Sequence, residues 1–137
     1  DNILEATGDE TILVVDDEDV VRKVAEGTLK AYGFKTISAA NGKEAIEVLE
    51  ERPEDVMLVL LDLTMPVMSG IETLAIIRER FAGMPVIVCS GYMVDLEGVE
   101  IENGLRPDAV IQKPYDIKDL TLKIRHLIDE AHAPLFA

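Results

Sequence analysis

Four charged residues directly follow apolar runs that we expect to form β-strands: Asp16, Asp17, Asp62 and Lys113. In an open sheet of parallel strands, ligands bind outside the carboxyl ends of the strands. If the runs form such a sheet, these charged side chains meet at one edge and are available for chemistry. Several carboxylates facing one ammonium are typical of a site for a divalent cation together with a phosphoryl group.

The three aspartates suggest a metal ion. If their strands are neighbours, the carboxylates repel one another, and this repulsion raises the pKa of at least one of them unless a cation lies between them. Mg²⁺ prefers oxygen ligands and is usually bound by one or two carboxylates with water and phosphate oxygens. An alternative interpretation is that Asp16 and Asp17 only cap the helix that follows, where the helix dipole favours negative charge. The sequence leaves both interpretations open for these two residues.

Asp62 is a candidate nucleophile. A carboxylate can attack phosphorus and form an aspartyl-phosphate while a metal ion neutralises charge on the transferring group. Lys113 would place a point charge on a phosphoryl oxygen, and Ser90, at the end of another apolar run, would offer its hydroxyl to a second oxygen. Gly91 leaves room for the loop to approach. Taken singly, Ser90 also fits a turn and Lys113 a solvated charge, but together the candidates occupy four strand ends.

Alternating apolar and amphipathic stretches predict the elements that position these residues. We expect five strands at approximately 11–16, 35–39, 56–61, 85–89 and 109–112. Helices are expected between them and after the last strand. This alternation is typical of a parallel sheet that is covered by helices on both faces.

The helix signals are uneven along the chain. The first helix is expected to end at Gly33, and one of its faces carries a set of apolar or small residues: Val20, Val21, Val24, Ala25, Thr28 and Leu29. The second and third helices are expected to open at Asn41 and Ser69, each with a glutamate three residues on, as in capping boxes. The last helix is expected to start near Asp116, whereas the stretch 93–104 carries few helix signals.

Composition restricts the function. The length of 137 residues suits one domain, which we expect at 11–131, with 1–10 as a linker or remnant and 132–137 as a tail. A net charge of −14 argues against nucleic-acid binding. No apolar stretch is long enough to span a bilayer and no signal peptide is visible, so we expect a cytoplasmic location, although the parent protein could be membrane-anchored. The single cysteine, Cys89, excludes an intramolecular disulfide and is expected to be buried.

Five short segments, taken together, resemble the receiver domains of bacterial two-component response regulators: Leu13-Val14-Val15-Asp16-Asp17-Glu18, Leu61-Asp62-Leu63-Thr64-Met65-Pro66, Ser69-Gly70, Ser90-Gly91-Tyr92 and Gln112-Lys113-Pro114-Tyr115. They follow the order and spacing of that family over most of the chain. The resemblance implies a flavodoxin-like (βα)5 three-layer α/β sandwich with a parallel five-stranded sheet in the order 2-1-3-4-5. The segments Ser90-Gly91-Tyr92 and Lys113-Pro114-Tyr115 are also similar to those of receivers attached to hybrid histidine kinases.

The resemblance also implies roles for single residues. Asp62 would accept a phosphoryl group from a histidine kinase or a histidine phosphotransfer domain. Asp17 and Asp62 would bind Mg²⁺ with the backbone carbonyl of Thr64, and Asp16 would act through a metal-bound water. Ser90 and Lys113 would contact the phosphoryl oxygens, and the peptide bond between Lys113 and Pro114 would be cis.

One departure concerns the switch residue of the family. Many receivers carry an aromatic residue three positions before the lysine of the last strand, and this chain has Val110 there. Val20 and Val21, beside the candidate site, are either core residues or a docking surface for a partner helix.

Two other functions stay open. One is a Mg²⁺-dependent phosphatase or phosphotransferase with an aspartate nucleophile, which usually needs a second acid where this chain has Thr64. The other is an interaction domain that is not phosphorylated, which retention of the charged residues disfavours. We expect this domain to catalyse only its own phosphorylation and dephosphorylation, with no nucleic-acid or membrane contact. The oligomeric state and the parent protein, a histidine kinase among the possibilities, are left open.

Overall fold

The structure is a computed structural model of the chain that describes residues 10–63, 69–90, 106–113 and 116–131. Strands and helices alternate along the chain in this order: β1 (Thr11–Val15), α1 (Asp19–Ala31), β2 (Lys35–Ala39), α2 (Gly42–Glu51), β3 (Val56–Asp62), α3 (Gly70–Arg80), β4 (Val86–Ser90), β5 (Ala109–Gln112) and α4 (Ile117–Ala131). The five predicted strands are thus all present. The stretch 93–104 lies outside the described residues.

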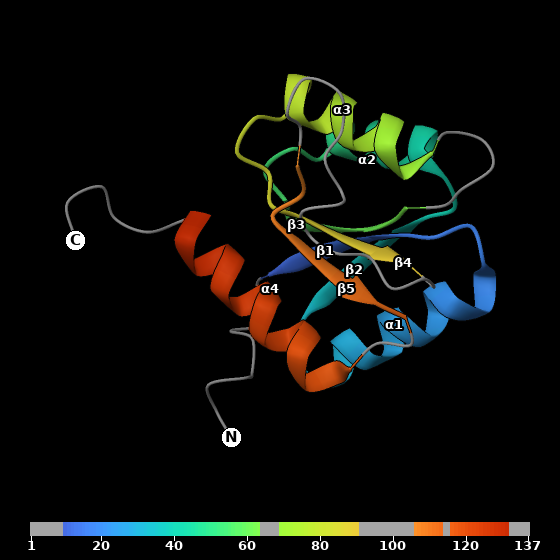
Figure 1. The fold of residues 1–137 in the computed structure, drawn as a ribbon, viewed down its shortest axis with the longest axis vertical. Helices are drawn as coiled ribbons and strands as arrows, with labels where there is room; N and C mark the ends of the chain where they lie inside the picture. Colours follow the sequence, from blue (N-terminus) through green and yellow to red (C-terminus); the bar gives the residue numbers. More distant parts are fainter. Residues whose placement is uncertain (1–9, 64–68, 91–105, 114–115, 132–137) are drawn as a thin grey trace.

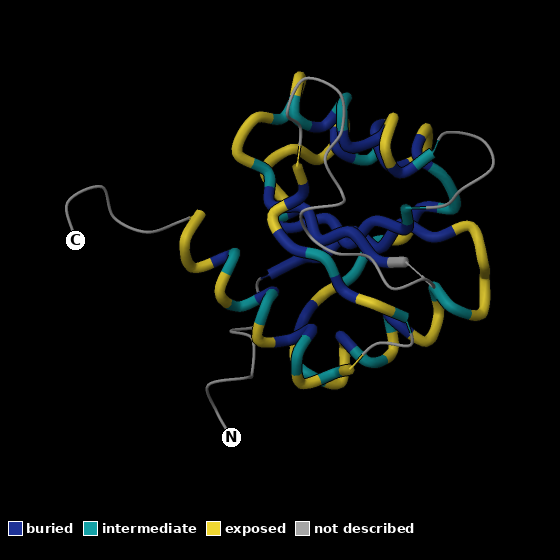
Figure 2. The backbone as a smooth tube through the Cα atoms, viewed as in Figure 1, coloured by how far each residue is buried: buried dark blue, intermediate teal, exposed yellow. Residues whose placement is uncertain are grey.

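The strands form one parallel sheet in the order β2-β1-β3-β4-β5, which confirms the predicted topology. Helices α1 and α4 cover one face, and α2 and α3 cover the other (Figure 1). Because both faces are covered, the inner strands are continuous apolar runs, and all five residues of β1 are buried. Buried residues accordingly gather along the sheet, while the outer sides of the helices are exposed (Figure 2).

Two hydrophobic clusters hold the layers together. Alternate residues of each strand point to opposite faces, so Val14 and Leu60 pack under α1 and α4, whereas Val15 and Leu61 pack under α2 and α3. The carboxyl ends of β1 and β3, where the candidate aspartates lie, are therefore anchored from both sides of the sheet.

The apolar face predicted for α1 is buried only in part. Ala25 and Leu29 are buried, but Val20 is 75% exposed and Val24 is 60% exposed. The two valines are four residues apart, so they lie together on the helix surface, beside the stripe that faces the sheet. Their apolar character had grouped them with Ala25 and Leu29 on one face of the helix.

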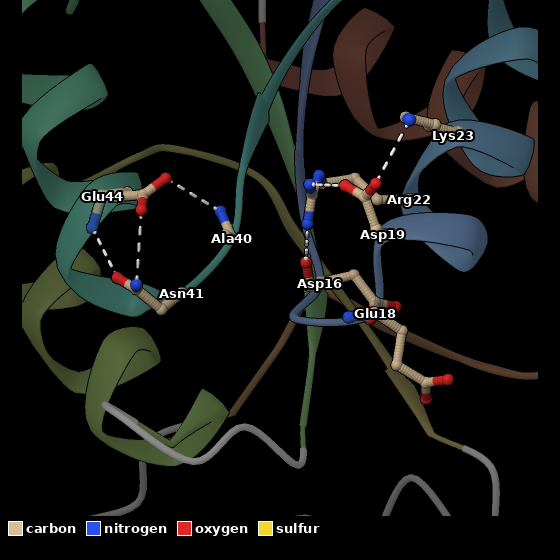
Figure 3. A network of polar contacts seen from close by, with 8 residues as sticks. All are labelled: Asp16, Glu18, Asp19, Arg22, Lys23, Ala40, Asn41 and Glu44. Atoms are coloured by element: carbon tan, nitrogen blue, oxygen red, sulfur yellow. Dashed lines mark hydrogen bonds and ion pairs between the residues drawn. The ribbon is translucent and has the colours of Figure 1, made fainter.

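The predicted helix boundaries are confirmed with one difference in detail. Gly33 follows α1 with φ 95°, and Ser69 and Glu72 form a capping box at the start of α3. At α2, the side chain of Asn41 accepts a hydrogen bond from the Glu44 amide, but the Glu44 carboxylate accepts from the amide of Ala40 (Figure 3).

Candidate functional site

Three aspartates converge at the carboxyl edge of the sheet. Asp16 and Asp17 follow β1, and Asp62 is the last residue of β3, the strand beside β1. One carboxylate oxygen from each aspartate lies within 4.8 Å of the other two. The side chains differ in exposure, because Asp16 and Asp62 are 1% and 4% exposed whereas Asp17 is exposed to solvent.

Lys113 brings a positive charge from the end of β5 to the same place. Its Nζ lies 2.7 Å from Asp16 Oδ2 and 3.6 Å from Asp62 Oδ1. Burial by itself would lower the pKa of Lys113, but the hydrogen bond to Asp16 and the charge of Asp62 outweigh burial and raise this pKa above its ordinary value of 10.5. Lys113 therefore stays protonated at neutral pH.

The donor set fits Mg²⁺. When ionised, three carboxylates against one ammonium leave two uncompensated negative charges in a site that is mostly shielded from water. The ligand atoms are all oxygens, which is what this hard cation prefers, and the exposed Asp17 leaves the site open to water on one side. A divalent ion would remove the excess charge.

The start of α1 bears on the alternative that Asp16 and Asp17 are only helix caps. The N-cap residue is Glu18, and its side chain makes no capping bond. Asp16 Oδ1 accepts a hydrogen bond from the Glu18 amide at 2.9 Å, which fixes the turn after β1 but satisfies no amide inside the helix. The carboxylate of Asp16 thus accepts hydrogen bonds from the turn and from Lys113 and does not cap the helix.

Arg22 holds the same turn from within α1 and was not singled out in the sequence. Its guanidinium donates to the backbone carbonyl of Asp16 at 2.7 Å and pairs with Asp19, which also pairs with Lys23 (Figure 3). The one signal in the sequence is the spacing of three residues between Asp19 and Arg22, which places them on the same side of a helix. That spacing does not reveal the bond to Asp16.

The other residues singled out in the sequence lie at the end of β4, in β5 or outside the described residues. Ser90 ends β4, where it is paired with Gln112 of β5, so its backbone is at the same edge as Asp62. Thr64, Gly91 and Pro114 lie outside the described residues, and with them the predicted carbonyl ligand and the predicted cis bond. Val110, in place of the aromatic switch residue, lies opposite Val88 in the sheet and is half-buried.

Cys89 and His126 are residues of types that often do chemistry, and their surroundings here are structural. Cys89 is fully buried, with its Sγ 3.5 Å from the carbonyl oxygen of Leu61, so it is a small core residue as predicted. His126 is on the surface of α4, where its Nε2 lies 2.8 Å from a carboxylate oxygen of Glu130.

Comparison with known proteins identifies the family. Residues 12–125 match the model of the response regulator receiver domain. The chain belongs to this family. Among curated relatives, it is 32% identical to the sensor kinase CckA of Brucella abortus over 90% of the chain, and 36% identical to the regulatory protein AtoC of Escherichia coli over 85% of the chain.

Solved receivers have the same fold. A CheY-like response regulator receiver domain protein from Methanospirillum hungatei superposes with a TM-score of 0.79 at 31% identity, covering 89% of this chain and 95% of the other. A receiver domain protein from Clostridium thermocellum gives 0.80 at 26% identity, covering 88% and 95%.

The curated relatives are longer proteins. The chain spans 13% of the sensor kinase and 25% of the regulatory protein. Among the helices that the structure describes, none has the length and apolar character needed to cross a membrane.

The family match makes the chain a receiver domain of two-component systems, a family that accepts phosphoryl groups from histidine kinases at an acidic site.

Proposed function

We propose that Asp62 is the residue that takes the phosphoryl group, from the phosphohistidine of a histidine kinase or of a histidine phosphotransfer domain. The observation that carries this proposal is the convergence of Asp16, Asp17 and Asp62 with Lys113 at the carboxyl edge of the sheet. Among the three aspartates, Asp62 alone ends an inner strand. The proposal places the receiver domain at 11–131 and the reaction in the cytoplasm.

The reaction is an in-line transfer. A carboxylate oxygen of Asp62 attacks the phosphorus, the new O–P bond forms, and the P–N bond to the donor histidine breaks with its electron pair left on the imidazole, which takes up a proton. Lys113 donates up to three hydrogen bonds, so it can keep its bond to Asp16 and still reach a phosphoryl oxygen. Ser90 would donate its hydroxyl to another phosphoryl oxygen.

The residues that would hold Mg²⁺ are Asp17, Asp62 and the backbone carbonyl of Thr64, with Asp16 acting through a water. When bound, this ion supplies positive charge that neutralises the transferring phosphoryl group. The exposure of Asp17 supports a direct contact. Asp16 already accepts hydrogen bonds from Lys113 and from the Glu18 amide, which supports an indirect role.

The exposed valines of α1 are the proposed contact for the donor. Val20 and Val24 lie in the first and second turns of the helix that follows Asp17, and both side chains are mostly exposed. A donor whose histidine reaches Asp62 must bring its own helix close to this surface, and two apolar side chains would anchor it. The 75% exposure of Val20 supports docking over core packing for this residue.

The two other functions considered from the sequence gain no support. A phosphatase with an aspartate nucleophile would usually need a second acid two residues after Asp62, where Thr64 stands. A domain without phosphorylation would have no use for a lysine that is partly buried among carboxylates, because burying that charge costs free energy. We therefore propose that this domain catalyses only its own phosphorylation and dephosphorylation.

The test is phosphorylation by acetyl phosphate, followed by intact mass. The chain should gain one phosphoryl group in the presence of Mg²⁺, and chelation of Mg²⁺ should abolish the gain. Asp62→Asn should remove it, whereas the control Asp129→Asn, on the exposed side of α4, should label like the unmodified chain. Label that survives in Asp62→Asn would refute the assignment.

A further inference from the structure

Helix α3 begins in direct backbone contact with the strand end that carries Asp62. The Gly70 amide donates a hydrogen bond to the Leu63 carbonyl oxygen at 3.0 Å. A β-carbon at position 70 would lie 2.4 Å from the carbonyl oxygen of Asp62, 2.6 Å from the Leu63 Cα and 2.9 Å from the Leu63 carbonyl oxygen. All three distances are too short for real contacts, and all three atoms belong to the backbone.

Close approach, not backbone conformation, requires glycine here. The described glycines with positive φ are Gly33 and Gly83, and Gly70 is not among them. Around Gly27 in α1, apart from its two chain neighbours and the nearby backbone of its own helix, no heavy atom lies within 4 Å of the place where a β-carbon would be. The crowding at Gly70 therefore comes from the contact between α3 and the end of β3.

Neither partner in this contact can move easily. The first turn of α3 is held by the capping box of Ser69 and Glu72, and Leu74 and Ile77 of the same helix are fully buried against the sheet. On the strand side, the Leu63 amide donates to the Cys89 carbonyl oxygen of β4 at 2.9 Å. A side chain at position 70 would therefore push on the peptide between Asp62 and Leu63.

We propose that Gly70 is a positioning residue for Asp62. Its lack of a side chain lets α3 sit on the Asp62 carbonyl, and this contact sets where the Asp62 carboxylate lies relative to Asp17 and Lys113. The inference rests on the proposed role of Asp62 as phosphoacceptor.

The expected effect follows from the size of the clash. Ordinary contact begins at 3.4 Å, so the Asp62 carbonyl must move about 1 Å away from a β-carbon that would lie at 2.4 Å. A misplacement of about 1 Å in a reacting group can lower a rate by about 100-fold. Gly70→Ala should therefore phosphorylate about 100-fold more slowly than the unmodified chain at saturating acetyl phosphate and Mg²⁺.

Two control variants separate positioning from loss of stability. Gly27→Ala adds the same methyl group in α1, where nothing is near. Ile77→Val removes a methyl group from the buried face of α3, about 10 Å along the helix from Gly70. Both should phosphorylate within about twofold of the unmodified chain, and circular dichroism should confirm the fold of all three variants.

Mg²⁺ affinity gives a second readout that does not depend on phosphorylation. Titration calorimetry with MgCl₂ should show weaker binding to Gly70→Ala, by about tenfold, and unchanged binding to both controls. If the unmodified chain were not labelled, the proposed function would fail. The ratio of Mg²⁺ affinities between the unmodified chain and Gly70→Ala would still test whether Gly70 positions Asp62. Normal labelling and normal affinity in Gly70→Ala, or an equal loss in Ile77→Val, would overturn the inference.

A further variant covers the case in which Gly70→Ala does not fold. Ser69→Ala removes the hydrogen bond that caps α3 and leaves Gly70 in place. If the first turn of α3 positions Asp62, this variant should phosphorylate severalfold more slowly while keeping its fold. A rate equal to that of the unmodified chain would overturn the inference.

Discussion

The three aspartates of the site have different surroundings. Asp16 and Asp17 therefore differ in what they contribute to stability and to ligand binding. Asp16 is buried, accepts a hydrogen bond from Lys113 at 2.7 Å and accepts another from the Glu18 amide. Asp17 is exposed at the mouth of the same site. Asp16 therefore stabilises the folded edge of the sheet, whereas Asp17 is available to a ligand from solvent.

This difference predicts unequal effects of two similar substitutions. Without Mg²⁺, Asp16→Ala should lower the free energy of unfolding by about 2 kcal/mol, because Lys113 loses a charged hydrogen bond. Asp17→Ala should change it little, since it removes an exposed charge beside two like charges. With Mg²⁺, the unmodified chain should gain stability by mass action, and Asp17→Ala should lose most of this gain.

Urea unfolding of the three proteins, with MgCl₂ and with chelator, measures both effects. A Mg²⁺-dependent gain in Asp17→Ala equal to that of the unmodified chain would contradict the direct contact. A loss of stability in Asp17→Ala as large as in Asp16→Ala would contradict the division of work between them.

At the residue scale, the sequence predicted which groups meet but not how they bond. Strand ends and a parallel sheet were enough to bring Asp16, Asp62 and Lys113 together. The sequence could not indicate that Lys113 lies nearer to Asp16 than to Asp62, because that depends on side-chain positions in a folded edge. The contacts of Arg22 and Gly70 were missed for the same reason, since both reach backbone carbonyls that no residue pattern encodes.

At the scale of elements, strand positions were predictable because buried strands of a parallel sheet are nearly continuous apolar runs. Caps at Asn41 and Ser69 were predictable because their signal is local. Which residues of α1 face the sheet was not predictable, because Val20 and Val24 are apolar and yet mostly exposed. The two exposed side chains, four residues apart, are consistent with the proposed docking surface for the phosphoryl donor.

The exposed valines predict a donor-specific defect. In the variant Val20→Ser with Val24→Ser, phosphotransfer from a purified histidine phosphotransfer domain that labels the unmodified chain should fall about tenfold, which corresponds to about 1.4 kcal/mol of lost contact. Labelling by acetyl phosphate should be unchanged, because this small donor needs no docking surface.

A matched control uses another exposed apolar residue. Leu122 on α4 is 43% exposed, and Leu122→Ser should leave both donors unaffected. The docking surface on α1 would be refuted by normal phosphotransfer to the double variant. It would also be refuted by a parallel loss with acetyl phosphate, because that result would indicate damage to the site itself.

At the scale of the whole molecule, the two edges of the sheet have different roles. The carboxyl edge carries the aspartates and Lys113, whereas the amino edge holds ion pairs that join distant parts of the chain. Arg78 of α3 pairs with Asp108 before β5 at 2.8 Å, and Arg125 of α4 pairs with Glu10 before β1 at 2.8 Å. The candidate phosphorylation site and the ion pairs that join distant parts of the chain thus lie at opposite ends of the strands.

The pair of Glu10 and Arg125 should contribute to stability without affecting phosphorylation. Both side chains are largely buried, at 6% and 18% exposure, so Glu10→Gln leaves a poorly solvated guanidinium with weaker compensation. This variant should lose about 2–3 kcal/mol in the free energy of unfolding. Asp129, the other carboxylate near Arg125, is 67% exposed, so Asp129→Asn should cost under about 1 kcal/mol.

Acetyl phosphate should label both variants at the rate of the unmodified chain under conditions where they are folded. Equal stability losses in the two variants, or slower labelling of folded Glu10→Gln, would show that the edges are not separate in this way.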